Sequence, residues 1–253
     1  MPFYVCLVPV CPVRVEASHR SEQVTQLLFG EMCEGVEVKD FIRIKVLYDG
    51  YDGWCQAAQL EEISEQQISS TTNKLAGEWV NLVTVNDQPM YIPFGSSLPN
   101  ENEAIFGKSK VVYKGSIIEP AANAYNEDSI RKLSLIFINT AYSWGGRSVF
   151  GIDCSGFTQL VFKCMNVKLL RDASQQATQG DAIGFLQEVK PGDLAFFDNA
   201  EGRISHVGIL LNAETIIHAS GKVRIDTIDN LGIVNKDTGK RTHKLRIIKR
   251  VEV

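Results

Sequence analysis

Three residues in the second half of this 253-residue chain have side chains suited to nucleophilic catalysis: Cys154, His206 and His218. A cysteine nucleophile needs a base to take its proton, and the base needs a third group to orient it. The two histidines lie in consecutive apolar runs, which favours two neighbouring strands joined by a hairpin. We therefore predict that Cys154 faces one or both histidines.

The element that must position the thiol is a helix. Phe157, Leu160 and Val161 recur at three- and four-residue spacing, which is typical of one apolar helix face. Asp153 is the expected N-cap, so Cys154 falls at the helix start. Because free N–H groups and the positive end of the helix dipole gather there, we expect a pKa below the usual thiol value. The alternative is a buried cysteine that acts only as a small hydrophobic residue.

The remaining histidines and cysteines give no pattern of a metal site. His19 and His243 stand in polar surroundings, and we expect both at the surface. The six cysteines are irregularly spaced, and Cys6 and Cys11 lack zinc-finger spacing. We predict reduced thiols, no metal and no cofactor.

Composition excludes several classes of partner. The net charge of −4 gives no basic field for nucleic acid or anionic lipid. No stretch is apolar and long enough for a membrane span. The first ten residues lack a basic segment and a cleavage site and contain Pro9, so we interpret them as a first strand and expect a cytoplasmic protein.

The chain order predicts three modules. Residues 1–62 read as short strands with polar turns, and residues 41–47 alternate as a half-buried strand does, so we expect a small all-β barrel. Residues 61–74 are a polar linker or short helix, and residues 75–120 predict a second, degenerate barrel. Helices and then strands over 126–253 predict an α+β domain with an antiparallel sheet.

Four motifs resemble the NlpC-like family of cell-wall cysteine peptidases, whose core is papain-like. They are Asp153-Cys-Ser-Gly-Phe157, Pro191-Gly-Asp-Leu-Ala-Phe-Phe197, Ser205-His-Val-Gly-Ile209 and Ile217-His-Ala-Ser220, in the order of the family. The resemblance implies that Cys154 is the nucleophile, His206 the base and His218 the third, polar residue. The stretches Leu-Phe-Gly-Glu31 and Tyr51-Asp-Gly-Trp54 resemble a bacterial SH3-like domain.

The whole chain resembles γ-D-glutamyl-L-diamino acid endopeptidases, which implies a murein tripeptide or tetrapeptide as substrate. Asp172 matches the position that binds the amine of the substrate's L-Ala, and Ala173 stands where relatives have a serine, with Ser174 one residue later. Tyr51 and Glu16 match residues that close the amine end of the pocket. Further substrate-binding candidates are Trp144 and Ser155, which we expect to line the cleft, Arg147, which we expect to meet a substrate carboxylate, and Asp153.

Several alternatives remain open at this point. The same thiol core serves amidases and acyltransferases, because a thioester intermediate does not choose between water and another acceptor. A non-catalytic wall-binding protein is a further alternative. For single residues, Asp172 can be a simple helix N-cap, and Tyr51 and Glu16 can be turn and surface residues.

Overall fold

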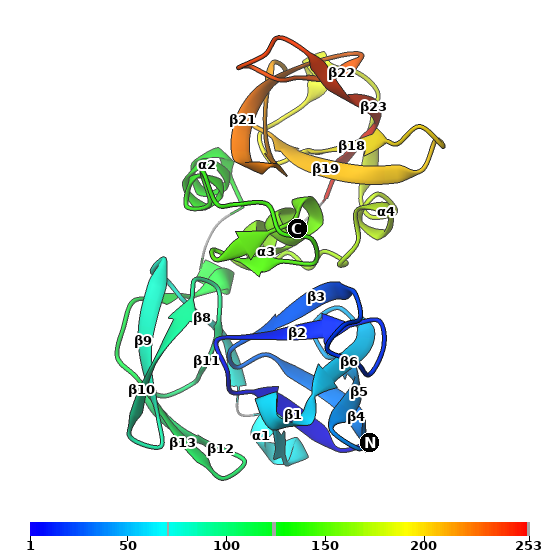
Figure 1. Ribbon diagram of the computed structural model, residues 1–253. Helices are drawn as coiled ribbons and strands as arrows, with labels where there is room; N and C mark the ends of the chain where they lie inside the picture. Colours follow the sequence, from blue (N-terminus) through cyan, green and yellow to red (C-terminus); the bar gives the residue numbers. More distant parts are fainter. Residues whose placement is uncertain (70, 123–124, 252–253) are drawn as a thin grey trace. The chain divides into compact units, whose positions relative to one another are not determined.

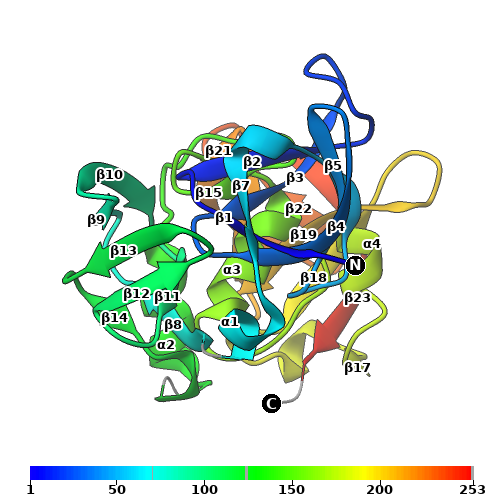
Figure 2. The ribbon, with the colours of Figure 1, turned by 90° about the horizontal axis from the view of Figure 1, so that it is seen from below.

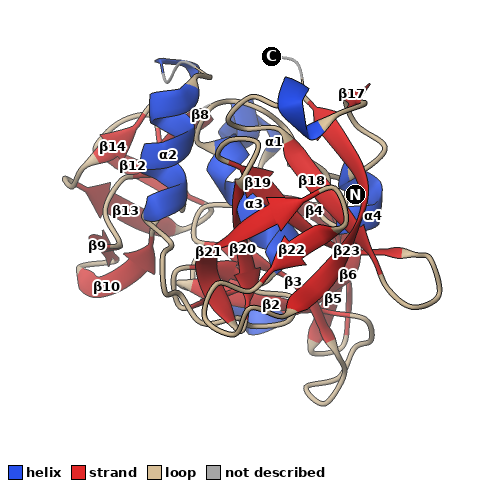
Figure 3. Ribbon diagram, turned by 90° about the horizontal axis from the view of Figure 1, so that it is seen from above, coloured by secondary structure: helices blue, strands red, loops and turns tan. Residues whose placement is uncertain are grey.

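The structure, a computed structural model, describes residues 1–69, 71–122 and 125–251 (Figure 1). Strands greatly outnumber helices, and the helices are short (Figure 3). The chain forms two compact units. The first comprises residues 1–122 together with 144–150, and the second comprises 123–143 and 151–253. The chain therefore returns to the first unit for seven residues shortly before Cys154.

The first unit begins with a seven-stranded antiparallel sheet in the order β3-β2-β6-β5-β4-β1-β7. Its strands are β1 (Phe3–Cys6), β2 (Val10–Arg14), β3 (Gln23–Leu28), β4 (Met32–Val38), β5 (Phe41–Val46), β6 (Asp52–Gln56) and β7 (Leu60–Ile63), with a 3₁₀ turn at Ala57–Gln59. In β5, Ile42 and Ile44 are buried and Arg43 and Lys45 exposed, as the alternating pattern predicts. The predicted first strand is also confirmed, as β1.

Two further sheets complete this unit (Figure 2). The elements are α1 (Glu65–Ser69), β8 (Thr71–Ala76), β9 (Val80–Val85), β10 (Gln88–Pro93), β11 (Ser97–Pro99), β12 (Glu103–Phe106), β13 (Ser109–Tyr113) and β14 (Ile117–Ile118), then a 3₁₀ turn at Pro120–Ala122. Val5 of β1 and Phe29, which directly follows β3, pack in one core cluster with Val83, Val111 and Tyr113. The two predicted barrels thus share a core, and their division into separate modules stays a prediction.

The second unit places helices before a sheet, as predicted. Its elements are α2 (Glu127–Leu135), β16 (Gly151–Ile152), α3 (Cys154–Lys163), α4 (Ala173–Gln176), β17 (Asp181–Ile183), β18 (Leu194–Asp198), β19 (Ile204–Leu210), β20 (Thr215–Ser220), β21 (Lys222–Asp229), β22 (Gly232–Val234) and β23 (Arg241–Arg250), with a 3₁₀ turn at Leu186–Glu188; β15 (Arg147–Ser148) lies in the segment that belongs to the first unit. Among the described residues, no helix is long and apolar enough to cross a membrane.

The sheet of the second unit is antiparallel and closes on itself. Its order is β17-β23-β18-β19-β20-β21-β22, and β22 also pairs with β23. Six strands therefore form a small barrel, with Phe197, Leu210 and Ile216 in its core (Figure 1). Helix α3 packs against β19 and β20, which carry the two histidines of the predicted site.

Two boundaries differ from the sequence-based expectation. We expect the first helix of this unit to continue to about Ala141, but α2 ends at Leu135. Its N-cap is Asn126, whose side chain accepts a hydrogen bond from the Ser129 N–H at 2.9 Å. In the first unit, the predicted loop 95–99 contains the short strand β11. Neither difference moves a predicted site residue.

Candidate active site

Cys154 is the first residue of α3, as predicted. The side chain of Asp153 caps the helix, because its Oδ1 accepts a hydrogen bond from the Gly156 N–H at 2.7 Å. The thiol is 6% exposed. Val207, the neighbour of His206 on β19, gives it a backbone hydrogen bond. The structure therefore brings the cysteine against the strand of the first histidine.

The electrostatics of the thiol differ from our expectation. Burial raises the pKa of Cys154 to about 12, and the carboxylate of Asp153 acts in the same direction. Backbone hydrogen bonds from Val207 and Ser155 and the charge of Arg171 lower the pKa, but by less. The prediction of a low pKa is therefore wrong, because loss of water around a buried thiolate outweighs the helix terminus. At neutral pH the resting group is a thiol.

An arginine that the sequence analysis missed fixes the start of α3. Arg171 is buried, and its Nη2 lies 2.6 Å from Oδ2 of Asp153. Its Nη1 donates to the Ser155 Oγ at 2.8 Å. The side chains of Asp153 and Ser155, both predicted substrate-binding candidates, are thus already bound within the protein. The available signal was an arginine directly after the apolar pair Leu169-Leu170, since a buried guanidinium needs an anion.

Tyr142 is a second residue near the thiol to which the sequence analysis gave no role. Burial raises the pKa of its phenol to about 12, and the charges of Cys154 and Asp153 act in the same direction. The phenol therefore stays protonated and is able to donate a hydrogen bond. Its backbone N–H donates to the Gly221 carbonyl at 3.0 Å, which attaches this segment to the turn after β20.

The two histidines lie on neighbouring strands, as the spacing predicts. On β19 and β20, Gly208 stands opposite His218, and His206 is two residues before Gly208 on the same face. A Cβ atom at Gly208 would lie only 2.8 Å from the Cβ of His218, so glycine leaves the room that His218 needs. The Nε2 of His206 and the Nδ1 of His218 are 2.8 Å apart, which is a hydrogen bond.

A buried carboxylate continues this contact on the next strand. Oδ2 of Asp226, on β21, lies 3.0 Å from Nε2 of His218. Arg224 donates to both oxygens of Asp226, at 2.8 and 2.9 Å, and the Lys236 N–H donates to Oδ1 at 2.9 Å. Burial alone would raise the pKa of Asp226, but the hydrogen bonds from His218, Arg224 and Lys236 together lower it below its usual value. Asp226 is therefore ionised.

The placement of His243 corrects the sequence analysis. We expect this residue at the surface, but its ring stacks on His206 with centroids 4.1 Å apart and an interplanar angle of 22°. Burial and the charge of His218 lower the pKa of His243 to about 4. Burial, followed by the charges of His243 and His218, also lowers the pKa of His206 well below 6.5. His206 is thus neutral at neutral pH. The other histidine expected at the surface, His19, is exposed.

The three histidines are close enough to raise the question of a metal. Their candidate ligand nitrogens all lie within 4.8 Å of one another. A zinc ion lies about 2.0–2.1 Å from each nitrogen that binds it. Two ligand nitrogens of one tetrahedral site are therefore more than roughly 3 Å apart. The facing nitrogens of His206 and His218 are 2.8 Å apart. This distance fits a shared proton rather than an ion between them.

Two predicted substrate-binding residues lie in and beside α4. Asp172 is the N-cap of this short helix and forms a capping box with Gln175, whose Oε1 accepts from the Asp172 N–H at 3.1 Å. Asp172 is therefore a helix N-cap, which was the alternative to a role in substrate binding. The residue is half-buried and follows Arg171 directly, which ties it to the cysteine end of the site. Ser174 is exposed on α4.

The first unit holds the other two residues expected at the amine end. Strands β2 and β6 pair with Arg14 opposite Trp54. Glu16 follows the end of β2 and Tyr51 precedes β6, so both lie at the same end of this antiparallel pair. Glu16 is exposed and Tyr51 is half-buried.

Residues 144–150 belong to the first unit through specific contacts. Trp144 is 62% exposed, and its Nε1 donates to Oε1 of Glu22 at 2.7 Å. Arg147 is 1% exposed, and its two terminal nitrogens bind the two carboxylate oxygens of Glu31 at 2.9 and 3.1 Å. The charge of Arg147 is thus balanced inside the protein. We therefore do not carry Arg147 into the proposed binding site, where we had expected it to meet a substrate carboxylate.

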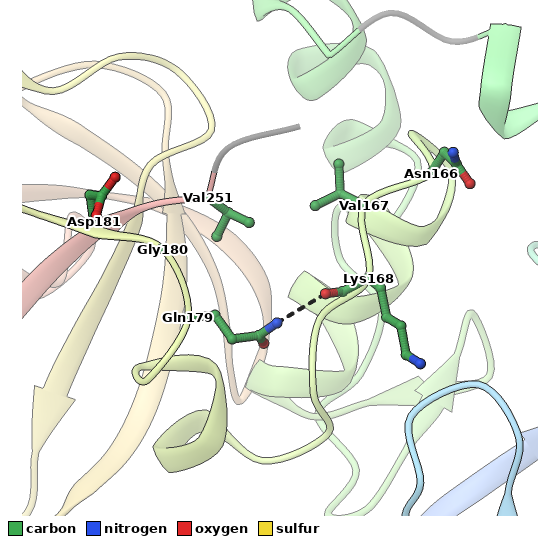
Figure 4. A pocket seen from close by; sticks show the side chains of 7 residues that line it. All are labelled: Asn166, Val167, Lys168, Gln179, Gly180, Asp181 and Val251. Carbon is green, nitrogen blue, oxygen red and sulfur yellow. Dashed lines mark hydrogen bonds between the residues drawn. The ribbon is translucent and has the colours of Figure 1, made fainter.

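A hollow at the surface of the second unit is separate from these residues. It has a volume of about 550 Å³ and is lined by Asn166, Val167, Lys168, Gln179, Gly180, Asp181 and Val251 (Figure 4). The side chain of Gln179 donates to the Lys168 carbonyl at 3.0 Å. The hollow is lined by none of the predicted site residues, and we assign no function to it.

Comparison with known proteins gives the family. The profile of the NlpC/P60 family matches residues 139–242, which include Cys154, His206 and His218. The probable endopeptidase NlpC of Escherichia coli K12 is 34% identical over 122 residues, which cover 44% of this chain and 79% of that protein. The chain belongs to the NlpC/P60 family. It is thus a cysteine peptidase of a family of peptidoglycan hydrolases.

Other NlpC/P60 relatives match most of the chain. Two curated proteins are named γ-D-glutamyl-L-lysine dipeptidyl-peptidase. The one from Bacillus subtilis 168 is 29% identical over 215 residues, covering 77% of this chain and 71% of that protein. The one from Bacillus cereus ATCC 10987 is 26% identical over 256 residues, covering 87% and 74%. A crystal structure of an NlpC/P60 family protein from Bacillus cereus ATCC 10987 has the same fold, with a TM-score of 0.81, 18% identity and coverage of 98% and 99%.

Proposed function

We propose that this protein hydrolyses the γ-D-glutamyl–diamino acid bond of murein peptides whose N-terminal L-Ala is free. The observation that carries the proposal is the placement of a buried thiol at the start of α3, against the strand of a neutral histidine that is hydrogen-bonded to a second one. The name of the two Bacillus relatives supports the bond and the free terminus, because a dipeptidyl-peptidase removes a dipeptide from an amino end.

In the proposed mechanism, Cys154 and His206 begin as a neutral pair. His206 takes the thiol proton as sulfur attacks the γ-glutamyl carbonyl, since both resting groups are uncharged at neutral pH. The Cys154 N–H at the helix start stabilises the oxyanion. His206 then passes the proton to the leaving amine, and water hydrolyses the thioester. His218 orients His206 throughout.

Recognition of the free amine is assigned to Asp172. An ammonium that enters a partly buried site needs an anionic partner, because an unpaired charge is costly there. A carboxylate has about four acceptor positions, so a carboxylate that caps a helix is also able to bind an ammonium. Glu16 and Tyr51 are proposed to act at the same end of the substrate. Trp144, Ser155 and Ser174 stay candidates for contacts along the peptide.

The fold of each unit and the compartment are part of the same proposal. The helices followed by an antiparallel sheet support a papain-like core in the second unit, and the strands of the first support SH3-like barrels over 1–62 and 75–120. All six cysteines lie among the described residues and are free thiols, as predicted. Reduced thiols favour a reducing compartment, so we propose a cytoplasmic role in recycling released murein peptides.

Mass spectrometry of defined peptides tests the function. The wild-type protein should release L-Ala-γ-D-Glu from L-Ala-γ-D-Glu-L-Lys or from the diaminopimelate peptide, and comparison of the two settles the diamino acid preference. N-acetylation of L-Ala should nearly stop cleavage. If the acetylated peptide or intact murein is cut as fast as the free peptide, the proposed specificity is wrong.

The role of Asp172 has its own test. Asp172→Asn removes the charge but keeps a residue that caps helices equally well. KM for the free peptide should rise about ten- to a hundredfold, because a hydrogen bond to a charged group contributes roughly 1.5–3 kcal/mol. The slow cleavage of the N-acetylated peptide, which carries no ammonium, serves as the control and should be equally slow in the wild-type protein and in the variant. An unchanged KM for the free peptide would assign the amine to another residue.

A further inference from the structure

We propose that Asp226 is a positioning residue that fixes the protons on His218 and His206, and so leaves Nδ1 of His206 as the atom that accepts the thiol proton. The proposal rests on the proposed role of His206 as the base. It adds a fourth member, on β21, to the set that the sequence motifs contain. Neither the motifs nor the spacing of the histidines points to this residue.

The first step concerns the proton on His218. Asp226 is 1% exposed, and its two oxygens receive hydrogen bonds from Arg224 and from the Lys236 N–H. An ionised carboxylate only accepts hydrogen bonds. Its Oδ2 lies 3.0 Å from Nε2 of His218, so that nitrogen must carry a proton and donate it. In its neutral form His218 has one N–H, so its Nδ1 is then an acceptor.

The second step concerns the proton on His206. The acceptor Nδ1 of His218 lies 2.8 Å from Nε2 of His206, which must therefore be the donor of that hydrogen bond. Neutral His206 carries its single proton on Nε2 and presents Nδ1 with a free lone pair. A base needs such a lone pair toward the thiol. If Nδ1 of His218 were instead the donor and Nε2 of His206 the acceptor, Nδ1 of His206 would carry a proton and could not accept another.

The groups around His206 and His218 are compatible with a proton on Nε2 of both residues. Arg224 binds Asp226 through Nε and Nη2 and also binds Asp237 at 2.8 Å, so the cation stays beside the carboxylate. His243 on β23 also faces the histidines, and its pKa of about 4 leaves it neutral at neutral pH. Asp226 is therefore the charged group that sets the direction of the two hydrogen bonds.

Nuclear magnetic resonance of the whole protein labelled with ¹⁵N-histidine tests the order directly. Proton–nitrogen correlation spectra at alkaline pH, where a free imidazole is neutral, show which ring nitrogen carries the proton. The expected result is a proton on Nε2 of both His206 and His218. Variants His206→Gln and His218→Gln assign the signals. A proton on Nδ1 of either residue in the wild-type protein would overturn the proposal.

Asp226→Asn measures the consequence for turnover. When the amide oxygen accepts from Arg224 Nη2 and the Lys236 N–H, the amide NH2 faces His218, so the preference for Nε2–H is lost. We expect kcat to fall about a hundredfold, the lower end of a general base's contribution, with KM little changed and a mixed proton position in the spectra. Wild-type turnover, or a loss of turnover with unchanged proton positions, would contradict the positioning role.

Asp229→Asn is the matched control. Asp229 lies on the same strand and also pairs with an arginine, Arg241, but at an exposed position away from the histidines. Its replacement should leave kcat and the spectra unchanged. The wild-type spectra decide the question even if Asp226→Asn does not fold. They also need no substrate, so a protein that leaves murein peptides intact refutes the proposed function alone, while a reversed proton order refutes only the role of Asp226.

Discussion

The cysteine side of the active site is built at one helix terminus, whereas the histidine side is built across four strands. We use "cysteine side" for Asp153, Cys154, Ser155 and Arg171, and "histidine side" for His206, His218, Arg224, Asp226 and His243. On the cysteine side, the N-cap and the nucleophile are consecutive residues, and only Arg171 comes from a more distant position. On the histidine side, contacts run between neighbouring strands: His206 on β19 contacts His218 on β20, and His218 contacts Asp226 on β21.

Both sides nevertheless solve the same electrostatic problem. Each holds a neutral reacting group, the thiol of Cys154 or the imidazole of His206, because burial disfavours the charged form. Each also holds a buried aspartate next to an arginine, Asp153 with Arg171 and Asp226 with Arg224. The permanent charges are thus paired beside these two groups, and in the proposed mechanism charge forms on Cys154 and His206 only during the reaction.

The largest expected effect comes from removing the nucleophile. Cys154→Ala should abolish hydrolysis of the free tripeptide, because no thioester can form. Cys164→Ala is the matched control, since this cysteine is buried at the other end of the same helix and has no proposed chemical role. Activity in the first variant, measured by mass spectrometry, would remove the cysteine side from the mechanism.

The two histidines should differ in their effect on turnover. His206→Ala removes the proposed base and should lower kcat by about 10²–10⁴-fold. His218→Asn keeps a polar partner for His206 and should cost less. Steady-state kinetics on the free tripeptide measure both variants. Equal losses, or a larger loss for His218→Asn, would mean that the roles on the histidine side are assigned wrongly.

The smallest effect on chemistry, but a clear one on stability, is expected at the buried ion pair of the cysteine side. Arg171→Met leaves Asp153 without its cation in a dry site, which should lower the free energy of unfolding by about 3–5 kcal/mol. Denaturant unfolding measures this. At the exposed Arg241–Asp229 pair, Arg241→Met should change it by less than about 1 kcal/mol. Equal losses in the free energy of unfolding would show that the buried Asp153–Arg171 pair contributes no more to stability than the exposed Arg241–Asp229 pair.

The same contrast explains what the sequence could reveal. The N-cap Asp153 and the helix face of α3 follow from neighbouring residues, and so do the alternation of β5 and the strands of the two histidines. Asp226 and His243 meet the histidines only through strand pairing, and their own neighbours in sequence carry no sign of it. The sequence gives no sign of the ion pair of Arg147 with Glu31, because the two residues lie more than a hundred positions apart. The thiol pKa was misjudged because burial cannot be read from local sequence.

The pH dependence of Cys154 alkylation tests most directly whether the two sides meet as a neutral pair. Iodoacetamide reacts with the thiolate, and mass spectrometry of the Cys154 peptide separates its rate from those of the other five cysteines. Since the pKa of Cys154 is about 12 and that of His206 lies well below 6.5, we predict a rate that rises continuously with pH from neutral to alkaline solution. A fast plateau that extends from acidic to neutral pH would instead show a resting thiolate–imidazolium pair and contradict this account.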